Sequence, residues 1–136
     1  MGNRLTVIDT DAIIDFFANR APGADVVSEL ISREEAILTS VSVFELYAGI
    51  EGKRRLSQVE ALVQNLVILP LDIIEAALAA KIYTKLKSKG QLIGTHDILI
   101  SGICLANELP LYTRNIAHFS KIEHLRILSS EEIMGH

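Results

Sequence analysis

The feature that most constrains the fold is an alternation of short, β-branched apolar runs with longer segments of helical periodicity. The short runs predict strands at residues 5–8, 36–39, 66–69, 109–113 and 125–128. Because helical segments separate them, neighbouring strands are expected to pair in parallel through right-handed crossovers, with helices on both faces. The sequence therefore predicts an α/β fold in three layers, with a central parallel five-stranded sheet.

Helical spacing predicts six helices, at residues 11–19, 24–32, 42–49, 55–65, 73–86 and 96–107. The fifth has the clearest start, because Asp72 is followed by Glu75 at the spacing of a capping box. Gly90 is the expected stop signal for that helix. Thr95 is the expected N-cap of the sixth helix.

Composition narrows the class of protein. A chain of 136 residues suits a single domain spanning 1–136, and its net charge of −4 argues against an overall basic nucleic-acid coat. The lone Cys104 excludes an intrachain disulfide and a cysteine-rich zinc site. The longest apolar run, at residues 98–106, is shorter than the ~20 residues that span a bilayer. We therefore expect no membrane association and a cytoplasmic location.

Three acidic residues fall at strand-to-helix junctions or in the first turns of helices, which the predicted topology places at one edge of the sheet. Asp9 directly follows the first strand, Glu45 lies inside an apolar run, and Asp97 precedes another. Each has a structural explanation when taken alone. Asp9 and Asp97 suit helix N-termini, and Glu45 stands at capping-box spacing from Ser42.

Taken together, the three acids favour a metal site. Carboxylates forced to one edge of a sheet repel one another and raise one another's pKa unless a cation neutralises them. Oxygen ligands of this kind suit Mg²⁺ or Mn²⁺ rather than zinc. Because Mg²⁺ commonly combines protein carboxylates with phosphate oxygens, such a site predicts phosphate chemistry.

Four ordered segments resemble a known family: VIDTDAIIDFF, SVSVFELYAGIE, GTHDILISGICLA and LPLYTRNIAHFSKIEHLRIL. They are similar to PIN-domain ribonucleases, and most of all to VapC-type toxins of prokaryotic toxin–antitoxin pairs. The likeness spans Val7 to Leu128. It implies a PIN-like fold and an endoribonuclease that depends on Mg²⁺ or Mn²⁺. It also implies an RNA substrate, a small VapB-like antitoxin as partner and a homodimer.

By this resemblance, Asp9, Glu45 and Asp97 match the family's acidic residues, which are both catalytic and metal-binding. Asp9 and Asp97 would be the firmest ligands, with Glu45 acting directly or through water. Metal-activated water would then cleave the RNA phosphodiester bond. Further residues are expected to support the acids or to contact RNA: Thr10, Asp11, Thr113, Arg114, Asn115 and His118.

The chain departs from the family in one segment. Many members have another acidic residue after the fourth strand, whereas residues 114–119 contain Asn115 and His118 and no carboxylate. Fewer anionic ligands therefore remain to hold a second metal. A structural role is favoured for His118, and Arg114 is the best candidate for an RNA contact. The lysines at positions 81–89 are interpreted mainly as solvated charges and helix-dipole partners.

Two rival classes fit parts of the pattern. Asp9 and Asp11 resemble the nucleophile and the acid/base of haloacid-dehalogenase-like phosphatases, but that reading leaves Glu45 without a role. A non-enzymatic, receiver-like signalling module would use Asp72 as its phosphoacceptor, although Asp72 has the features of a helix cap.

Overall fold

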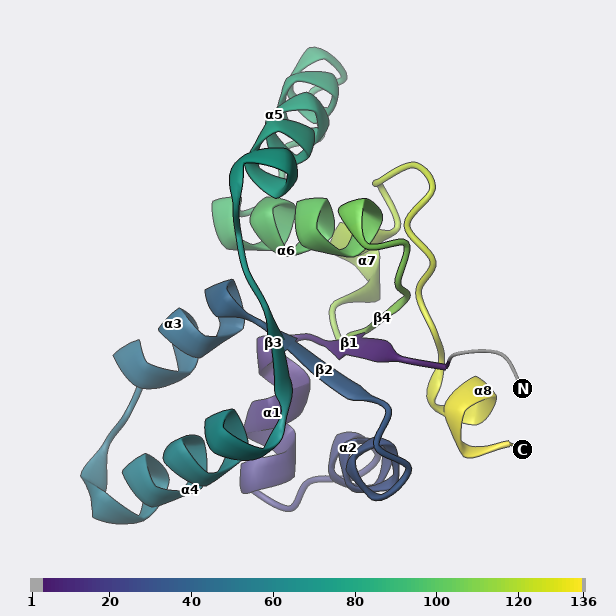
Figure 1. Ribbon diagram of the computed structural model, residues 1–136. Helices are drawn as coiled ribbons and strands as arrows, with labels where there is room; N and C mark the ends of the chain where they lie inside the picture. Colours follow the sequence, from purple (N-terminus) through teal and green to yellow (C-terminus); the bar gives the residue numbers. More distant parts are fainter. Residues whose placement is uncertain (1–3, 136) are drawn as a thin grey trace.

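A four-stranded parallel sheet forms the centre of the protein (Figure 1), seen in a computed structural model that describes residues 4–135. Residues 1–3 and 136 of the expected domain lie outside the described part. The strands are β1 (Thr6–Ile8), β2 (Ala36–Thr39), β3 (Val67–Leu69) and β4 (Leu111–Tyr112). Their spatial order is β3-β2-β1-β4, and every pairing is parallel. The α/β architecture and the parallel sheet are thus confirmed.

The expected fifth strand at residues 125–128 is wrong. This segment follows β4 in parallel but forms only an isolated bridge between Leu111 and Ile127. Leu111 donates its N–H to Arg126 and accepts one from Leu128, both at 2.9 Å. Because β4 is only two residues long, its outer side offers too little backbone to extend this bridge into a ladder.

Helices cover both faces of the sheet, as expected for three layers (Figure 1). Alternate residues of β1 point to opposite faces, so Ile8 and Val7 belong to two different cores. Ile8 packs in the core that holds the inward residues of α1 (Thr10–Phe17), α2 (Gly23–Ser32) and α4 (Gly52–Asn65).

The second core, which contains Val7, lies on the other face of the sheet. It holds the inward residues of α5 (Ile73–Ser88) and α6 (Thr95–Ala106). None of the helices within residues 4–135 combines the length and the apolar character needed to cross a membrane.

The predicted start of one helix is confirmed, and the predicted cap of another is wrong. Asp72 and Glu75 form the capping box of α5. Thr95, however, is the first residue of α6, and the N-cap is Gly94, which has no side chain to make the capping bond. Two short helices went unpredicted, α7 (Ile116–Phe119) and α8 (Ser130–Met134). The second carried a readable signal, a capping box between Ser129 and Glu132.

The α5–α6 contact depends on Gly102. A Cβ atom at this position would lie 2.7 Å from the carbonyl oxygen of Glu75 and 2.8 Å from the Cβ of Ala79. We expect Gly102→Ala to lower the free energy of unfolding by about 1–3 kcal/mol, because one helix must shift to make room. Chemical denaturation measures this, with Gly94→Ala as control because nothing lies within 4 Å of its added Cβ. Equal stability of the two variants would contradict this account of the packing.

Candidate active site

Asp9 is placed by the end of β1 and the start of α1. It is the N-cap of α1, and its Oδ1 accepts the N–H of Thr10 at 2.8 Å. Its Oδ2 accepts the hydroxyl of Thr113 at 2.7 Å. Because β1 and β4 are neighbours, the residues that follow these strands meet at one edge of the sheet. Asp9 is only 5% exposed, so a buried carboxyl group stands at this edge.

The surroundings of Asp9 disfavour its negative charge. Burial, together with the charges of Asp11 and Asp97, raises the pKa of its carboxyl group to about 7. The hydrogen bonds from Thr113 and Thr10 oppose this effect only in part. A carboxylate in such a position gains stability when a cation approaches it.

Glu45 lies on α3 (Ser40–Ala48), and the capping explanation for it is wrong. The N-cap of α3 is Thr39, whose hydroxyl accepts the N–H of Ser42 at 3.1 Å. The Glu45 side chain points elsewhere: its Oε1 accepts the hydroxyl of Thr10 at 2.6 Å, and its Oε2 lies 3.0 Å from Nδ1 of His96. Glu45 is thereby tied to the residue that follows Asp9.

Two polar residues of this network were missed in the sequence. The hydroxyl of Ser42 is fully buried and lies 2.9 Å from that of Thr10. His96, in the first turn of α6, pairs with Glu45 and also meets the ring of Phe44 edge-on at 5.6 Å. Its position directly before Asp97 was the available signal, since neighbours in a first helical turn share the same end of the helix.

Asp97 is the third residue of α6, and α7 approaches it. Its Oδ2 lies 3.3 Å from Nδ1 of His118, and Nδ2 of Asn115 lies 2.8 Å from the same ring nitrogen. Since that nitrogen cannot accept from Asn115 and donate to Asp97 at once, only one bond forms in a given tautomer. The residues that stand in place of the family's further carboxylate therefore lie beside Asp97.

Arg114 faces acidic residues of α1. Its guanidinium is 3.1 Å from Oδ1 of the buried Asp15, and its backbone N–H reaches Oδ1 of Asp11 at 3.4 Å. Burial raises the pKa of Asp11, and Arg114 partly reverses that shift. The side chain of Arg114 is still 60% exposed, so the guanidinium is anchored without being covered.

The donor set fits an ion held by few protein ligands. Within residues 4–135, no three His, Cys, Asp or Glu side chains converge closely enough to enclose a metal among them. Mg²⁺ commonly takes one or two carboxylates and completes its shell with water and phosphate oxygens. Asp9 and Asp97, which repel each other, match that requirement. Beside them, Glu45 and residues 94–97 line an open cavity of about 300 Å³.

The receiver-like alternative loses its phosphoacceptor. The side chain of Asp72 caps α5. It accepts the backbone N–H of Ile73, and the Glu75 side chain accepts the backbone N–H of Asp72 in a capping box. This residue therefore has a complete structural role.

Comparisons with known proteins identify the family. Residues 6–125 match the PIN domain family. Ribonuclease VapC of Rickettsia bellii is 31% identical over 103 residues, which are 71% of this chain and 77% of that protein. Ribonuclease VapC1 of Methanocaldococcus jannaschii is 27% identical over 86% of this chain and 80% of its own length.

A solved structure adds the three-dimensional match. DNA-bound VapBC from Salmonella typhimurium superposes with a TM-score of 0.80 at 25% identity, covering 93% of this chain and 98% of that one. Sequence and structure agree over nearly the same region. The chain therefore belongs to the PIN domain family, as one of its VapC-type members.

Proposed function

We propose that this chain is a metal-dependent endoribonuclease that acts in the cytoplasm as the toxin of a toxin–antitoxin pair. The observation that carries the proposal is the buried Asp9, whose charge is disfavoured by burial and by Asp97 at the edge where Glu45 also lies. The relatives support the reaction class, since proteins similar to this chain in sequence are named Ribonuclease VapC.

Asp9 and Asp97 would hold the ion, Mg²⁺ or Mn²⁺, with Glu45 reaching it through water. The bound ion would neutralise the scissile phosphate and lower the pKa of the attacking water. Thr113 fixes the carboxyl group of Asp9, and α6 carries Asp97 in its first turn. These contacts hold both ligands in place before RNA arrives.

Glu45 is the residue that we assign as proton acceptor for the attacking water. The hydroxyl of Thr10 and the ring of His96 hold its two oxygens at 2.6 and 3.0 Å. Its side chain is 26% exposed, so water reaches it. Attack by water on phosphorus with loss of the 3′-oxygen leaves one RNA end with a 5′-phosphate and the other with a 3′-hydroxyl.

The direct test is cleavage by the purified chain. RNA is incubated with the protein in Mg²⁺, in Mn²⁺ and in a chelator, and the new ends are sequenced. The proposal requires internal cuts that depend on the ion and that leave 5′-phosphates. Cleavage that continues in the chelator, or products ending in a 2′,3′-cyclic phosphate, would overturn it.

Glu45→Gln is expected to reduce cleavage by about 100-fold or more, because the amide cannot take a proton from water. The melting temperature should change little, since Gln still accepts the hydroxyl of Thr10. Initial cleavage rates and thermal unfolding measure the two effects. Glu60→Gln, at an exposed position of α4, makes the same change of charge and should leave both unchanged. A fully active Glu45→Gln protein would remove Glu45 from the reaction.

A small antitoxin and a second copy of the chain are the proposed protein partners. The similarity to the VapBC structure from Salmonella typhimurium supports the antitoxin. A largely apolar cavity of about 420 Å³ between α1, α2 and α4 offers a groove for the antitoxin. Ile73 and Ile74 at the start of α5 are 81% and 72% exposed. Exposed isoleucines side by side suit contact with another protein, which supports the homodimer.

A further inference from the structure

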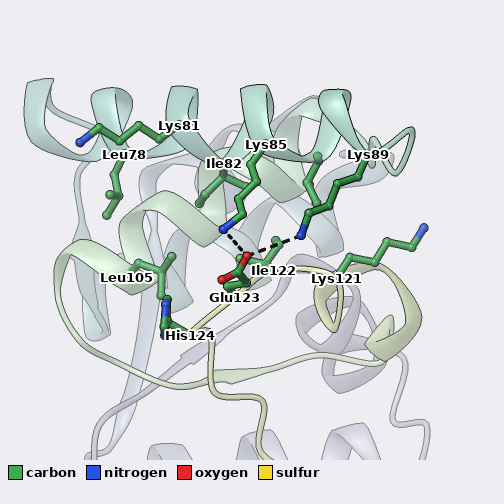
Figure 2. A pocket seen from close by; sticks show the side chains of 11 residues that line it. Leu78, Lys81, Ile82, Lys85, Lys89, Leu105, Lys121, Ile122, Glu123 and His124 are labelled. Atoms are coloured by element: carbon green, nitrogen blue, oxygen red, sulfur yellow. Dashed lines mark ion pairs between the residues drawn. The ribbon is translucent and has the colours of Figure 1, made fainter.

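A separate cavity of about 160 Å³ lies between α5, the end of α6 and residues 121–124 (Figure 2). Its walls include the aliphatic side chains of Leu78, Ile82, Leu105 and Ile122. None of the three acidic residues assigned to catalysis lines it. The cavity is therefore not part of the site already described.

Lysines form the rim of this cavity. Lys81 and Lys85 lie on successive turns of α5, Lys89 is its C-cap residue, and Lys121 lies across from them (Figure 2). The whole chain has six lysines and a net charge of −4, so four of the six meet at one place in an acidic protein. The helix dipole explains a positive charge at the end of α5, but neither Lys81, a turn earlier, nor Lys121, on another segment. The positive charge is concentrated by the fold.

Glu123 places an anionic group against part of the lysine rim. Its carboxylate forms an ion pair with Lys85 and lies 3.5 Å from the ammonium group of Lys89 (Figure 2). Lys85 lowers the pKa of this carboxyl group. Among residues 4–135, the carboxylate of Glu123 pairs with Lys85 and Lys89, and no carboxylate pairs with Lys81 or Lys121.

Residues 118–121 lead from the candidate active site to the lysine rim. Lys121 donates its backbone N–H to the carbonyl oxygen of His118 at 3.3 Å, and the ring of His118 lies 3.3 Å from Asp97. One short turn of chain thus joins the site edge to the lysine rim. An RNA strand that leaves the candidate active site over α7 would meet these lysines next.

We propose that this cavity binds the sugar–phosphate backbone of the RNA strand beside the nucleotide at which cleavage occurs. The inference rests on the proposed ribonuclease function and assigns the surface that holds its substrate. Lysines four residues apart on a helix are separated by about 6 Å along its axis, which gives a row of charges suited to a chain with regularly spaced phosphates. A small anion would need only one or two of them.

The lining predicts contact without sequence preference. The residues around the cavity include no Phe, Tyr or Trp side chain on which a base could stack, and His124 supplies a single imidazole ring. Lysines that contact phosphates position a nucleic acid but do not read its sequence. The lysine rim should therefore contribute affinity to all RNA sequences alike, and selection of the cleavage site belongs elsewhere.

The test measures binding separately from cleavage. A fluorescein-labelled single-stranded RNA of about 16 nucleotides is titrated with protein in a chelator, at several salt concentrations. The combined variant Lys81→Gln, Lys85→Gln, Lys89→Gln should bind more weakly. Its slope of log affinity against log salt should be smaller by about 2, at about 0.7 for each phosphate contact on a single strand. Gln retains much of the alkyl chain, and losing exposed ion pairs has little effect on stability.

Lys87→Gln is the matched single control for Lys85→Gln. It lies on the same helix but its ammonium group is over the ring of Tyr83, 5.8 Å from the centroid, and it does not line the cavity. Lys85→Gln should reduce RNA affinity and Lys87→Gln should not. In cleavage assays the rim variants should raise KM on a long RNA and leave kcat unchanged, because they do not touch the reacting atoms.

Glu123→Gln gives the opposite prediction. Removing this carboxylate frees Lys85 and Lys89, so RNA affinity should rise and the salt slope should steepen by about 1. If the ion pairs of Glu123 only stabilise the fold, Glu123→Gln should leave RNA binding unchanged.

The proposal is overturned if wild type does not bind the RNA at low salt, or if neither the lysine variants nor Glu123→Gln alters binding. Lysine variants that keep RNA binding but release a co-purified acidic protein would assign the cavity to that partner instead. If the protein does not cleave RNA but the variants change RNA affinity as expected, the proposed function is refuted and the assignment of this surface to RNA binding is kept.

Discussion

Replacing Asp97 by Asn is expected to abolish metal-dependent RNA cleavage while the protein remains folded. The substitution keeps the size of the side chain and removes the charge that faces His118 and acts on Asp9. Residues that merely support metal ligands typically contribute 10–100-fold, so loss of a ligand should reduce the initial rate by more than about 100-fold. Cleavage rates in Mg²⁺ and circular dichroism of the same samples measure the outcome.

Asp25→Asn provides a closely matched control for Asp97→Asn. Asp25 is also the third residue of its helix, α2, and its side chain is exposed. Both substitutions remove a charge that interacts favourably with a helix N-terminus, so any effect through the helix dipole is shared. Only Asp97→Asn should lose activity. Near-normal cleavage by folded Asp97→Asn protein would exclude this residue from the metal site.

The strand and helix elements that were predicted correctly carry strong local signals. Ala36–Thr39 forms β2 at the expected bounds, and the capping box of α5 was visible in Asp72 and Glu75. The errors arose where tertiary contacts decide. Residues 125–128 have the composition of a strand, but β4 is too short to pair with more than one residue of them. At the start of α6 the backbone places Gly94 at the cap, although Thr95 is the better capping residue by type.

The site was predictable in its acidic residues but not in its contacts. Strand ends in a parallel sheet share an edge, which was enough to bring Asp9, Glu45 and Asp97 into consideration together. The bonds from Thr10 to Glu45 and from Thr113 to Asp9 span 35 and 104 residues of sequence. No local pattern encodes such contacts. The lysine rim was hidden for the same reason, because Lys121 joins the α5 lysines only after folding.

Asp9 links the candidate site to stability. In the unfolded chain its pKa is near the ordinary value of 3.8, whereas in the folded protein it is about 7. Between these values the folded state binds a proton that the unfolded state has released, so stability falls as pH rises through this window. Below pH 4 both states are protonated, and above pH 7 both are ionised. At pH 8 the folded protein therefore carries the whole cost of a buried charge.

In the absence of metal, the stability of Asp9→Asn relative to wild type is accordingly expected to be higher at pH 8 than at pH 4. At 1.36 kcal/mol for each pKa unit, the difference in free energy of unfolding between variant and wild type should shift toward the variant by about 4 kcal/mol from pH 4 to pH 8. Asn also loses one acceptor toward Thr10 or Thr113, which lowers stability at both pH values and does not affect the shift.

Mg²⁺ should make wild type the more stable of the two proteins at pH 8, since an ion bound only by the folded wild type stabilises it and leaves Asp9→Asn unchanged. Urea denaturation at the two pH values, with and without Mg²⁺, measures both effects, and Asp25→Asn should show neither. A wild type whose stability relative to Asp9→Asn does not depend on pH would mean that folding leaves the pKa of Asp9 unchanged, and the account of Asp9 as an uncompensated buried charge would be wrong.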